Sequence, residues 1–454
     1  MTANKERTTI KVQSERAILA AVRLPDSNYD IANPFGELRA LAEQAGALVV
    51  GEVEQRRERP EAGMFMGRGK VEELLGICDA TGATTVIFDH DLSPRQISNI
   101  EEVVKRKVID RSELILDIFA SRATTHEAKL QVELAQLEYT YPRLKSMWTH
   151  LERQAGGGIG TRGPGEQQLE TDRRLVQARK LDLLRELRLI QDRKRREVRR
   201  RKSDHVTVGL VGYTNAGKST LFNTLTTGGA YADDRVFATL VTRTREWDLG
   251  GGLAVMLSDT VGFVRDLPHN LIASFRATLE EATHADLLLI VLDASDDAAE
   301  LQYRTVMSTL EDLFKETAEA EAADGESWSE PAVALLLNKA DRLPTNAAVL
   351  EWQSRVPGAI AISSLPGADG RMRLGQDALE DIVRRHAQGD VDEVEITLPL
   401  SEAKSIHFIE NRGHVLDRAY DTSTVTLRAR IGRRQLDQLR SSGTRMQVRS
   451  GGPA

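Results

Sequence analysis

The chain has a single cysteine, Cys78, among its 454 residues. One cysteine can form neither an intramolecular disulfide nor a cysteine-rich metal site. Long apolar runs are also missing, since none reaches the roughly 18 residues that a membrane-spanning helix needs. The first sixteen residues are polar and lack the apolar centre of a secretion signal. We therefore expect a soluble, cytoplasmic protein with a disordered segment at residues 1–16, in which Cys78 is a small core residue of a helix.

Charge is distributed unevenly along the chain. The net charge at pH 7 is −7, yet residues 166–204 hold 14 Lys or Arg against 8 Asp or Glu. The basic residues are densest at Arg193–Lys202. A run of this kind is often only the solvated face of a helix. In an acidic protein, and beside an unusual glycine-rich segment, it favours contact with a nucleic-acid phosphate backbone.

The stretch Gly212–Ser219 carries the clearest chemical signal. It fits G-x-x-x-x-G-K-[ST] and stands between an apolar run that predicts a strand and a pattern that predicts a helix. Backbone N–H groups of such a loop turn toward phosphate oxygens, and the helix N-terminus adds its positive dipole end. Lys218 is predicted to reach the β- and γ-phosphates, and Ser219 to bind Mg²⁺. The predicted nucleotide contacts of this loop are Gly212, Tyr213, Thr214, Asn215, Ala216, Gly217, Lys218, Ser219 and Thr220.

Two further motifs follow predicted strands downstream. The first is Asp259-Thr260-Val261-Gly262, in which Asp259 is expected to hold the magnesium shell and the Gly262 N–H to meet a γ-phosphate. The second is Asn338-Lys339-Ala340-Asp341. Its carboxylate, Asp341, can accept hydrogen bonds from guanine N1–H and the 2-amino group, which adenine cannot match. Lys339 is expected to lie along the base and Asn338 to tie this loop to the phosphate loop. Ser363, Ser364 and Leu365 are expected to form the last loop on the base side.

In this order the motifs predict a guanine-nucleotide switch with GTP and Mg²⁺ as its ligands. Strands alternating with helices predict an α/β fold whose nucleotide domain, residues 205–388, has a doubly wound, mostly parallel sheet. Residues 17–122 repeat the alternation and predict a separate N-terminal α/β domain. There Gly67-Arg68-Gly69-Lys70 begins a helix and is either an anion site or a tight turn. Residues 389–440 predict a small C-terminal α/β domain, and residues 441–454 a loose tail.

Residues 123–204 predict a long antiparallel helical hairpin. Leucines and aromatic residues from Leu130 to Leu151 step by four and three, and Leu169, Val176, Leu183 and Ile190 step by seven. Two such stripes with a short connection should pack against each other. The glycine-rich segment 156–165 then forms the tip, either as a flexible turn or as a probe that enters an RNA site.

With these motifs the chain resembles the HflX family of translation-associated GTPases over residues 17–440. The resemblance rests on Gly67–Lys70, Glu133–Leu137, the glycine segment 156–165, Gly212–Ser219 and Asp259–Val264. It implies GTP hydrolysis, with ATP hydrolysis in some members, and catalytic roles for Lys218, Thr239 and Gly262. It also implies binding to the large ribosomal subunit and splitting of stalled or idle 70S ribosomes under stress. A monomer is expected, with association at ribosomes or a membrane surface but not with DNA.

Three features of the switch and phosphate loops bear on hydrolysis. The family pattern A-T-L-D-P-T-T-R is replaced here by Ala238-Thr239-Leu240-Val241-Thr242-Arg243-Thr244-Arg245, which keeps the magnesium-contacting Thr239 but loses the Asp-Pro pair. Phe263 stands where related enzymes often place a glutamine that orients the attacking water, so assistance to hydrolysis is expected. Asn215 resembles the potassium-coordinating asparagine of cation-activated GTPases, or is simply a residue that tolerates a tight turn.

Three classes of function remain open from the sequence. The first is a ribosome-directed GTPase that splits or rescues 70S ribosomes. The second is a GTPase acting on another RNA, in ribosome assembly or tRNA modification. The third is an RNA-binding scaffold with negligible turnover.

Overall fold

The computed structural model describes residues 15–25, 29–154, 164–204, 206–226, 242–250, 253–265, 282–323, 325, 328–389, 391–441 and 443–450. They fall into two compact units that divide after Ile190. Within the described ranges, no helix is both long enough and apolar enough to cross a bilayer. Cys78 is buried, as predicted.

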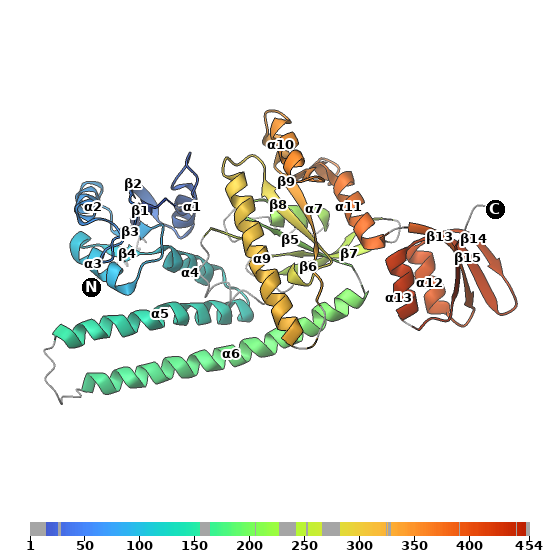
Figure 1. Ribbon diagram of the computed structural model, residues 1–454, viewed down its shortest axis with the longest axis horizontal. Helices are drawn as coiled ribbons and strands as arrows, with labels where there is room; N and C mark the ends of the chain where they lie inside the picture. The colour runs from blue at the N-terminus through green and yellow to red at the C-terminus, as the bar shows by residue number, and fades with distance from the viewer. Residues whose placement is uncertain are drawn as a thin grey trace, which may run out of the picture. The chain divides into compact units, whose positions relative to one another are not determined.

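The first unit opens with a four-stranded parallel sheet in the order β2-β1-β3-β4. Four helices alternate with its strands, which confirms the predicted α/β pattern (Figure 1). The first strand begins at Arg16, the last residue of the segment predicted to be disordered, and the rest of that segment up to residue 14 lies outside the described residues. The elements are β1 (Arg16–Arg23), α1 (Gly36–Gln44), β2 (Leu48–Arg56), α2 (Arg68–Thr81), β3 (Thr85–Phe88), α3 (Pro94–Val104), β4 (Lys107–Ile109) and α4 (Arg111–Arg122).

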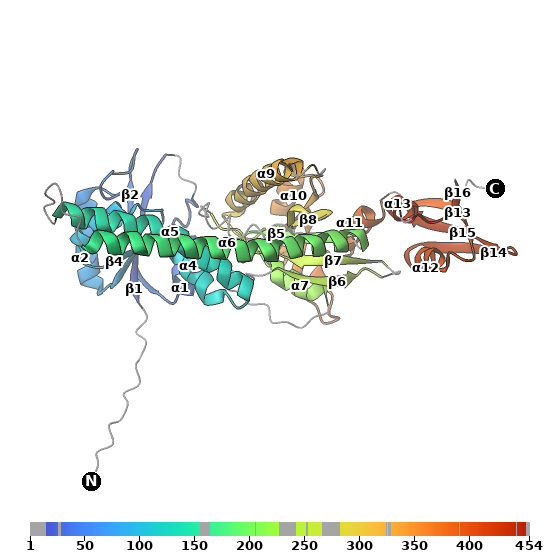
Figure 2. The same ribbon diagram turned by 90° about the horizontal axis from the view of Figure 1, so that it is seen from below.

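Two long helices, α5 (His126–Gln154) and α6 (Pro164–Asp204), form the predicted hairpin. In both views α5 runs beside the first part of α6 (Figures 1 and 2). Ion pairs join Glu133 to Arg179 at 2.7 Å and Glu138 to Lys180 at 2.8 Å. A shared apolar cluster lies between the helices and contains Leu130, Leu134, Leu183 and Leu187, with Leu137 and Ile190 against it. Residues 155–163, which hold most of the predicted tip, lie outside the described residues.

The second unit contains a six-stranded sheet in the order β10-β9-β8-β5-β7-β6. Every strand pair in it is parallel except β6 with β7, so the predicted mostly parallel sheet is confirmed. Its strands are β5 (Thr207–Gly212), β6 (Arg243–Asp248), β7 (Ala254–Asp259), β8 (Leu287–Asp293), β9 (Ala332–Asn338) and β10 (Ile360–Ala361). All seven residues of β8 are buried, which is typical of a central strand covered on both faces.

Helices cover both faces of this sheet. They are α7 (Lys218–Leu225), α9 (Ala299–Ala323), α10 (Ala347–Arg355) and α11 (Gln376–Gln388). Figure 2 shows α9 and α10 on one face and α7 on the other. Leu221 and Phe222 of α7 share a buried cluster with Leu379 and Val383 of α11, so α11 covers the same face as α7. This arrangement is the doubly wound architecture expected from the sequence.

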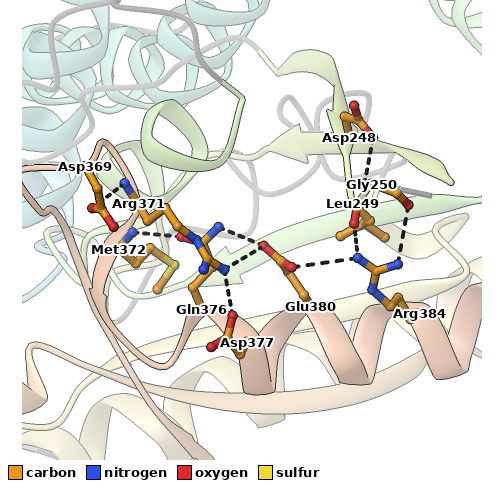
Figure 3. Close-up of polar contacts among 10 residues, drawn as sticks. All are labelled: Asp248, Leu249, Gly250, Asp369, Arg371, Met372, Gln376, Asp377, Glu380 and Arg384. Carbon is orange, nitrogen blue, oxygen red and sulfur yellow. Dashed lines mark hydrogen bonds and ion pairs between the residues drawn. The ribbon is translucent and has the colours of Figure 1, made fainter. Parts of the chain in front are cut away.

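A polar network joins α11 to two turns of the nucleotide domain (Figure 3). At one end Arg371, in the hairpin of β11 (Ser363–Pro366) and β12 (Met372–Leu374), pairs with Asp377 at 2.6 Å and Glu380 at 3.5 Å. At the other end Arg384 donates to the Leu249 carbonyl in the turn between β6 and β7. The helix thereby connects the segment that follows the predicted base-side loop with the turn between these two strands.

The C-terminal part corrects two expectations. Its strands β13 (Val391–Pro399), β14 (His414–Tyr420), β15 (Thr424–Gly432) and β16 (Gln447–Ser450) form an antiparallel sheet in the order β14-β15-β13-β16. Figure 1 shows α12 (Ala403–Arg412) and α13 (Arg433–Ser441) on one face of it. The prediction of a loose tail over 441–454 is wrong, because β16 lies within it and pairs with β13. The strand β14 was missed as well.

Candidate functional site

The phosphate loop lies between the end of β5 at Gly212 and the start of α7 at Lys218. Gly212 has φ +150° and Gly217 has φ +99°, values that residues with a Cβ rarely adopt. A Cβ at Gly212 would overlap the Val291 carbonyl oxygen, and one at Gly217 would overlap Asn338 Nδ2. The two glycines therefore permit both the turn and the close packing of neighbouring strands around it.

The Lys218 side chain is buried within this loop. Its Nζ donates hydrogen bonds to the carbonyl oxygens of Gly212 at 3.0 Å and Tyr213 at 2.7 Å. Burial lowers the pKa of Lys218 to about 8, although the Asp259 carboxylate acts in the opposite direction. The ammonium is therefore held in place by the loop itself, and an anionic phosphate beside it would favour its charged form.

Ser219 and Asp259 lie together where α7 begins and β7 ends. The Ser219 hydroxyl donates to Asp259 Oδ2 at 2.8 Å, and Asp259 is fully buried. One hydroxyl and one carboxylate suit Mg²⁺, which prefers oxygen ligands and usually keeps water and substrate phosphates as its remaining ligands. No group of three or more His, Cys, Asp or Glu side chains in the described part of the chain could hold a metal ion. The Ser219–Asp259 pair fits a metal ion bound together with a nucleotide, because phosphate oxygens and water would supply its other ligands.

The segment after Asp259 is bonded to the phosphate loop. Phe263 N donates to the Gly212 carbonyl at 3.0 Å, and Thr214 N donates to the Phe263 carbonyl at 2.8 Å. The Tyr213 hydroxyl accepts from Arg265 N at 2.8 Å. Tyr213 was predicted only as a member of the nucleotide loop, and the sequence held no signal for this second contact. A Cβ on Gly262 would lie 2.9 Å from Lys218 Nζ, so Gly262 adjoins the lysine.

Thr260 and Val261 are buried behind this segment. The Thr260 hydroxyl donates to the Leu210 carbonyl of β5 at 2.7 Å. Phe263 is only 2% exposed. These residues fix the course of the backbone, and their side chains do not form an open surface beside the phosphate loop.

On the base side, Asn338 at the end of β9 links the phosphate loop to Ser363, Ser364 and Leu365, which lie in strand β11 rather than in the expected loop. Its Nδ2 donates to the Ala216 carbonyl at 2.7 Å and to Ser364 Oγ at 3.1 Å, and its Oδ1 accepts from Ser364 N at 3.0 Å. The predicted tie between the third motif and the phosphate loop is therefore present. Thr224 of α7 adds a hydrogen bond to the Ser364 carbonyl at 2.8 Å.

The remaining base-side residues differ in exposure. Asp341 is exposed in a short 3₁₀ turn, Ala340–Arg342, and Leu365 is 38% exposed, while Ser363 and Ser364 are buried. Lys339 has φ +58° and forms an ion pair with Asp293 at 2.6 Å. Asp293 belongs to none of the motifs recognised in the sequence, so this partner was missed.

Two predicted ligands stand apart from these contacts. Thr239 belongs to residues 227–241, which lie outside the described residues. Asn215 is exposed with φ +61°. Asparagine is one of the few non-glycine residues that adopt this conformation readily, so the turn explains the residue type whether or not Asn215 also binds a potassium ion.

Comparison with known proteins agrees with this geometry. Family models match residues 33–120 (GTP-binding GTPase N-terminal), 122–202 (GTP-binding GTPase Middle Region) and 207–338 (50S ribosome-binding GTPase). The chain is 37% identical to the GTPase HflX of Caldanaerobacter subterraneus subsp. tengcongensis over 92% of this chain and 91% of that protein. It is 46% identical to the GTPase HflX of Alkalihalophilus pseudofirmus, over 72% and 74% of the two chains. For the GTPase HflX of Escherichia coli the identity is 50%, over 61% and 65%.

Among solved structures, the chain is similar to a GTP-binding protein from the hyperthermophilic archaeon Sulfolobus solfataricus in complex with GDP. The identity is 25%, the TM-score is 0.39, and the match covers 82% of this chain and 98% of that one. The three family models follow one another over residues 33–338 of this chain, and the match to the Caldanaerobacter protein covers 92% of it. The chain therefore belongs to the HflX family of ribosome-associated GTPases, and its reaction is the hydrolysis of GTP.

Proposed function

We propose that this GTPase binds the large ribosomal subunit and uses GTP binding and hydrolysis to split or rescue stalled or idle 70S ribosomes under stress. The main support is the match of residues 207–338 to the 50S ribosome-binding GTPases. The basic end of α6, Arg193–Lys202, adds a segment suited to phosphate-backbone contact. It ends five residues before β5 begins, and β5 leads directly into the phosphate loop.

Within the nucleotide site we assign roles by chemistry. Lys218 contacts the β- and γ-phosphates, and the Gly262 N–H meets the γ-phosphate. Ser219 and Asp259, with Thr239 from the first switch, would hold Mg²⁺, which supplies positive charge to the phosphates when it is bound. Asp341 accepts from the guanine edge, while Ser363, Ser364 and Leu365 close the base side. Asn338 keeps the base loop and the phosphate loop together.

Hydrolysis needs help from outside the isolated protein. Phe263 cannot hydrogen-bond an attacking water, and both its backbone N–H and its carbonyl are already bonded to the phosphate loop. We therefore propose slow turnover alone and strong stimulation by large subunits. A potassium ion held through Asn215 is a second source of transition-state charge, and a preference for K⁺ over Na⁺ would support it.

Sedimentation with isolated ribosomal subunits tests the function directly. We expect co-sedimentation with large subunits in the presence of a non-hydrolysable GTP analogue, weaker binding with GDP, and fewer intact 70S particles when GTP is present. Binding to tRNA or to assembly intermediates instead of mature subunits would favour a GTPase acting on another RNA. Binding with no subunit-stimulated hydrolysis would favour a scaffold.

A charge variant sharpens the experiment. Replacing Arg199, Arg200, Arg201 and Lys202 with glutamine should weaken subunit binding and flatten its dependence on salt, because fewer counterions are released. The matched control replaces four exposed arginines outside α6, namely Arg56, Arg304, Arg433 and Arg440. An equal loss in both variants would contradict a specific role for the basic end of α6.

A further inference from the structure

Asp293 lies at the carboxyl end of β8, beside the guanine-recognition motif. In the register of the sheet, Asp293 is paired with Asn338 at the end of β9. Its Oδ2 lies 2.6 Å from Lys339 Nζ, and the two side chains are only 12% and 17% exposed. The ion pair therefore joins the end of one strand to the recognition motif that follows its neighbour, largely away from solvent.

The Asp293 carboxylate is oriented from its own side of the contact. Ser295 donates to Asp293 Oδ1 twice, from its backbone N at 3.0 Å and from its hydroxyl at 2.7 Å. Ala294 N donates to the Asn338 carbonyl at 2.9 Å. These bonds fix one carboxylate oxygen and leave the other directed at the lysine, so the aspartate is placed independently of Lys339.

Lys339 is the flexible member of the pair. The long side chain of Lys339 has many possible rotamers. The backbone of Lys339 has φ +58°, a value that non-glycine residues adopt only where the surrounding structure holds them. Ala340 N donates to the Ile362 carbonyl at 3.1 Å, which fixes the next residue of the motif. The Asp293 carboxylate is the only ion-pair partner of Lys339 among the described residues.

We propose that Asp293 is a positioning residue for the guanine base. It holds the Lys339 side chain in one conformation, so that the aliphatic part of the lysine is already positioned to pack against the base beside Asp341. This inference rests on the assignment of Lys339 and Asp341 to the base. Because GDP and GTP share that base, Asp293 acts equally on both nucleotides and leaves the chemical step at the γ-phosphate unchanged.

The test is nucleotide release from the full-length protein. In Asp293→Asn, an amide of the same shape replaces the charge, and the lysine loses its partner. We expect dissociation of fluorescently labelled GDP and of a labelled GTP analogue to accelerate by about tenfold each, which equals about 1.4 kcal/mol. The turnover number at saturating GTP should stay within about twofold. Asp296→Asn removes the same charge three residues later at an exposed position and should leave release unchanged.

Two further measurements separate positioning from a purely structural role. In a Lys339→Met background, Asp293→Asn should add no further acceleration, because its effect passes through the lysine. Additive effects, or release from Asp293→Asn within twofold of wild type, would overturn the proposal. Competition by inorganic tripolyphosphate should be equal in wild type and Asp293→Asn, since it has no base. Failure of the base assignment itself would show separately, as an unchanged base preference in Asp341→Asn.

Discussion

Single residues of the nucleotide site differ in how far the sequence revealed them. Lys218, Ser219, Asp259 and Asn338 belong to motifs whose spacing along the chain is enough to assign each a chemical role. Asp293 belongs to no such motif, because its partner Lys339 is 46 positions away and only the pairing of β8 with β9 brings the two together. Contacts that depend on strand pairing cannot be predicted from local spacing.

The low pKa of Lys218 makes nucleotide binding depend on pH. Its pKa in the nucleotide-free protein is about 8, whereas an ordinary lysine titrates near 10.5. Bound phosphates favour the charged amine and raise its pKa, so binding above pH 8 requires uptake of a proton. We therefore expect the Kd for Mg²⁺-GDP to rise between pH 8 and pH 9, by at most about tenfold.

Calorimetry in buffers of different ionisation enthalpy would measure that proton uptake directly. Lys218→Met should bind more weakly and without the uptake. A Kd for the wild type that stays constant from pH 7 to pH 9 would contradict a depressed lysine pKa.

Base recognition can be tested by changing one atom of Asp341. In Asp341→Asn a donor replaces an acceptor, which disfavours the guanine 2-amino group and favours the 2-oxo group of xanthine. We expect GTP affinity to fall and xanthosine triphosphate affinity to rise, with a combined change in preference of at least about a hundredfold, because mismatched polar groups are left unpaired. Competition binding with the two nucleotides gives the ratio, and a variant that keeps its guanine preference would show that Asp341 does not read the base.

At the scale of elements, the sequence revealed buried strands better than edge strands. The apolar runs before the phosphate loop and before Asn338 predicted β5 and β9, which are inner strands of the sheet with buried carboxyl ends. The strands β6, β14 and β16 were missed or assigned to other features. Each lies at the edge of its sheet and mixes charged with apolar residues, so its conformation depends on one partner strand rather than on its own pattern.

The phosphate loop has no room for an added methyl group at Gly217. Gly217→Ala would place a Cβ against Asn338 Nδ2 at a residue with φ +99°, and it would displace the tie to Ala216. We expect nucleotide affinity to fall by at least about tenfold and the free energy of unfolding by about 1–3 kcal/mol.

Gly76→Ala is the matched control for this variant. Gly76 lies inside α2, and a Cβ there would meet no atom within 4 Å. This change should leave nucleotide binding intact and slightly raise the free energy of unfolding, since alanine favours the helix. Urea unfolding measures the free energy of unfolding of both variants. If Gly217→Ala is no less stable than Gly76→Ala, the phosphate loop has room for a side chain at Gly217.

At the scale of the whole molecule, the sequence predicted the order of the parts. It placed an α/β domain, a helical hairpin, a GTPase domain and a small α/β domain in succession, because the spacing of apolar residues along the chain differs from one part to the next. It predicted the small domain as α/β but not its strand order β14-β15-β13-β16, which is decided by contacts between distant segments. The β-α-β-β-α-β order of that domain becomes complete only with residues near the end of the chain.

The late strand β16 has a practical consequence for handling the protein. It pairs along one edge of β13 in antiparallel register, with Val394 opposite Ser450 and Thr397 opposite Gln447. A chain shortened to end at Ser441 would expose the backbone N–H and carbonyl groups of β13, and an open strand edge is a template for joining a second chain. We expect the shortened protein to self-associate with rising concentration while the full chain remains monomeric, as light scattering coupled to size-exclusion chromatography would record. Removing only residues 451–454 leaves β16 intact and should cause no association. If the protein ending at Ser441 also stays monomeric, β16 is dispensable as a cover, and the edge of β13 is protected in another way.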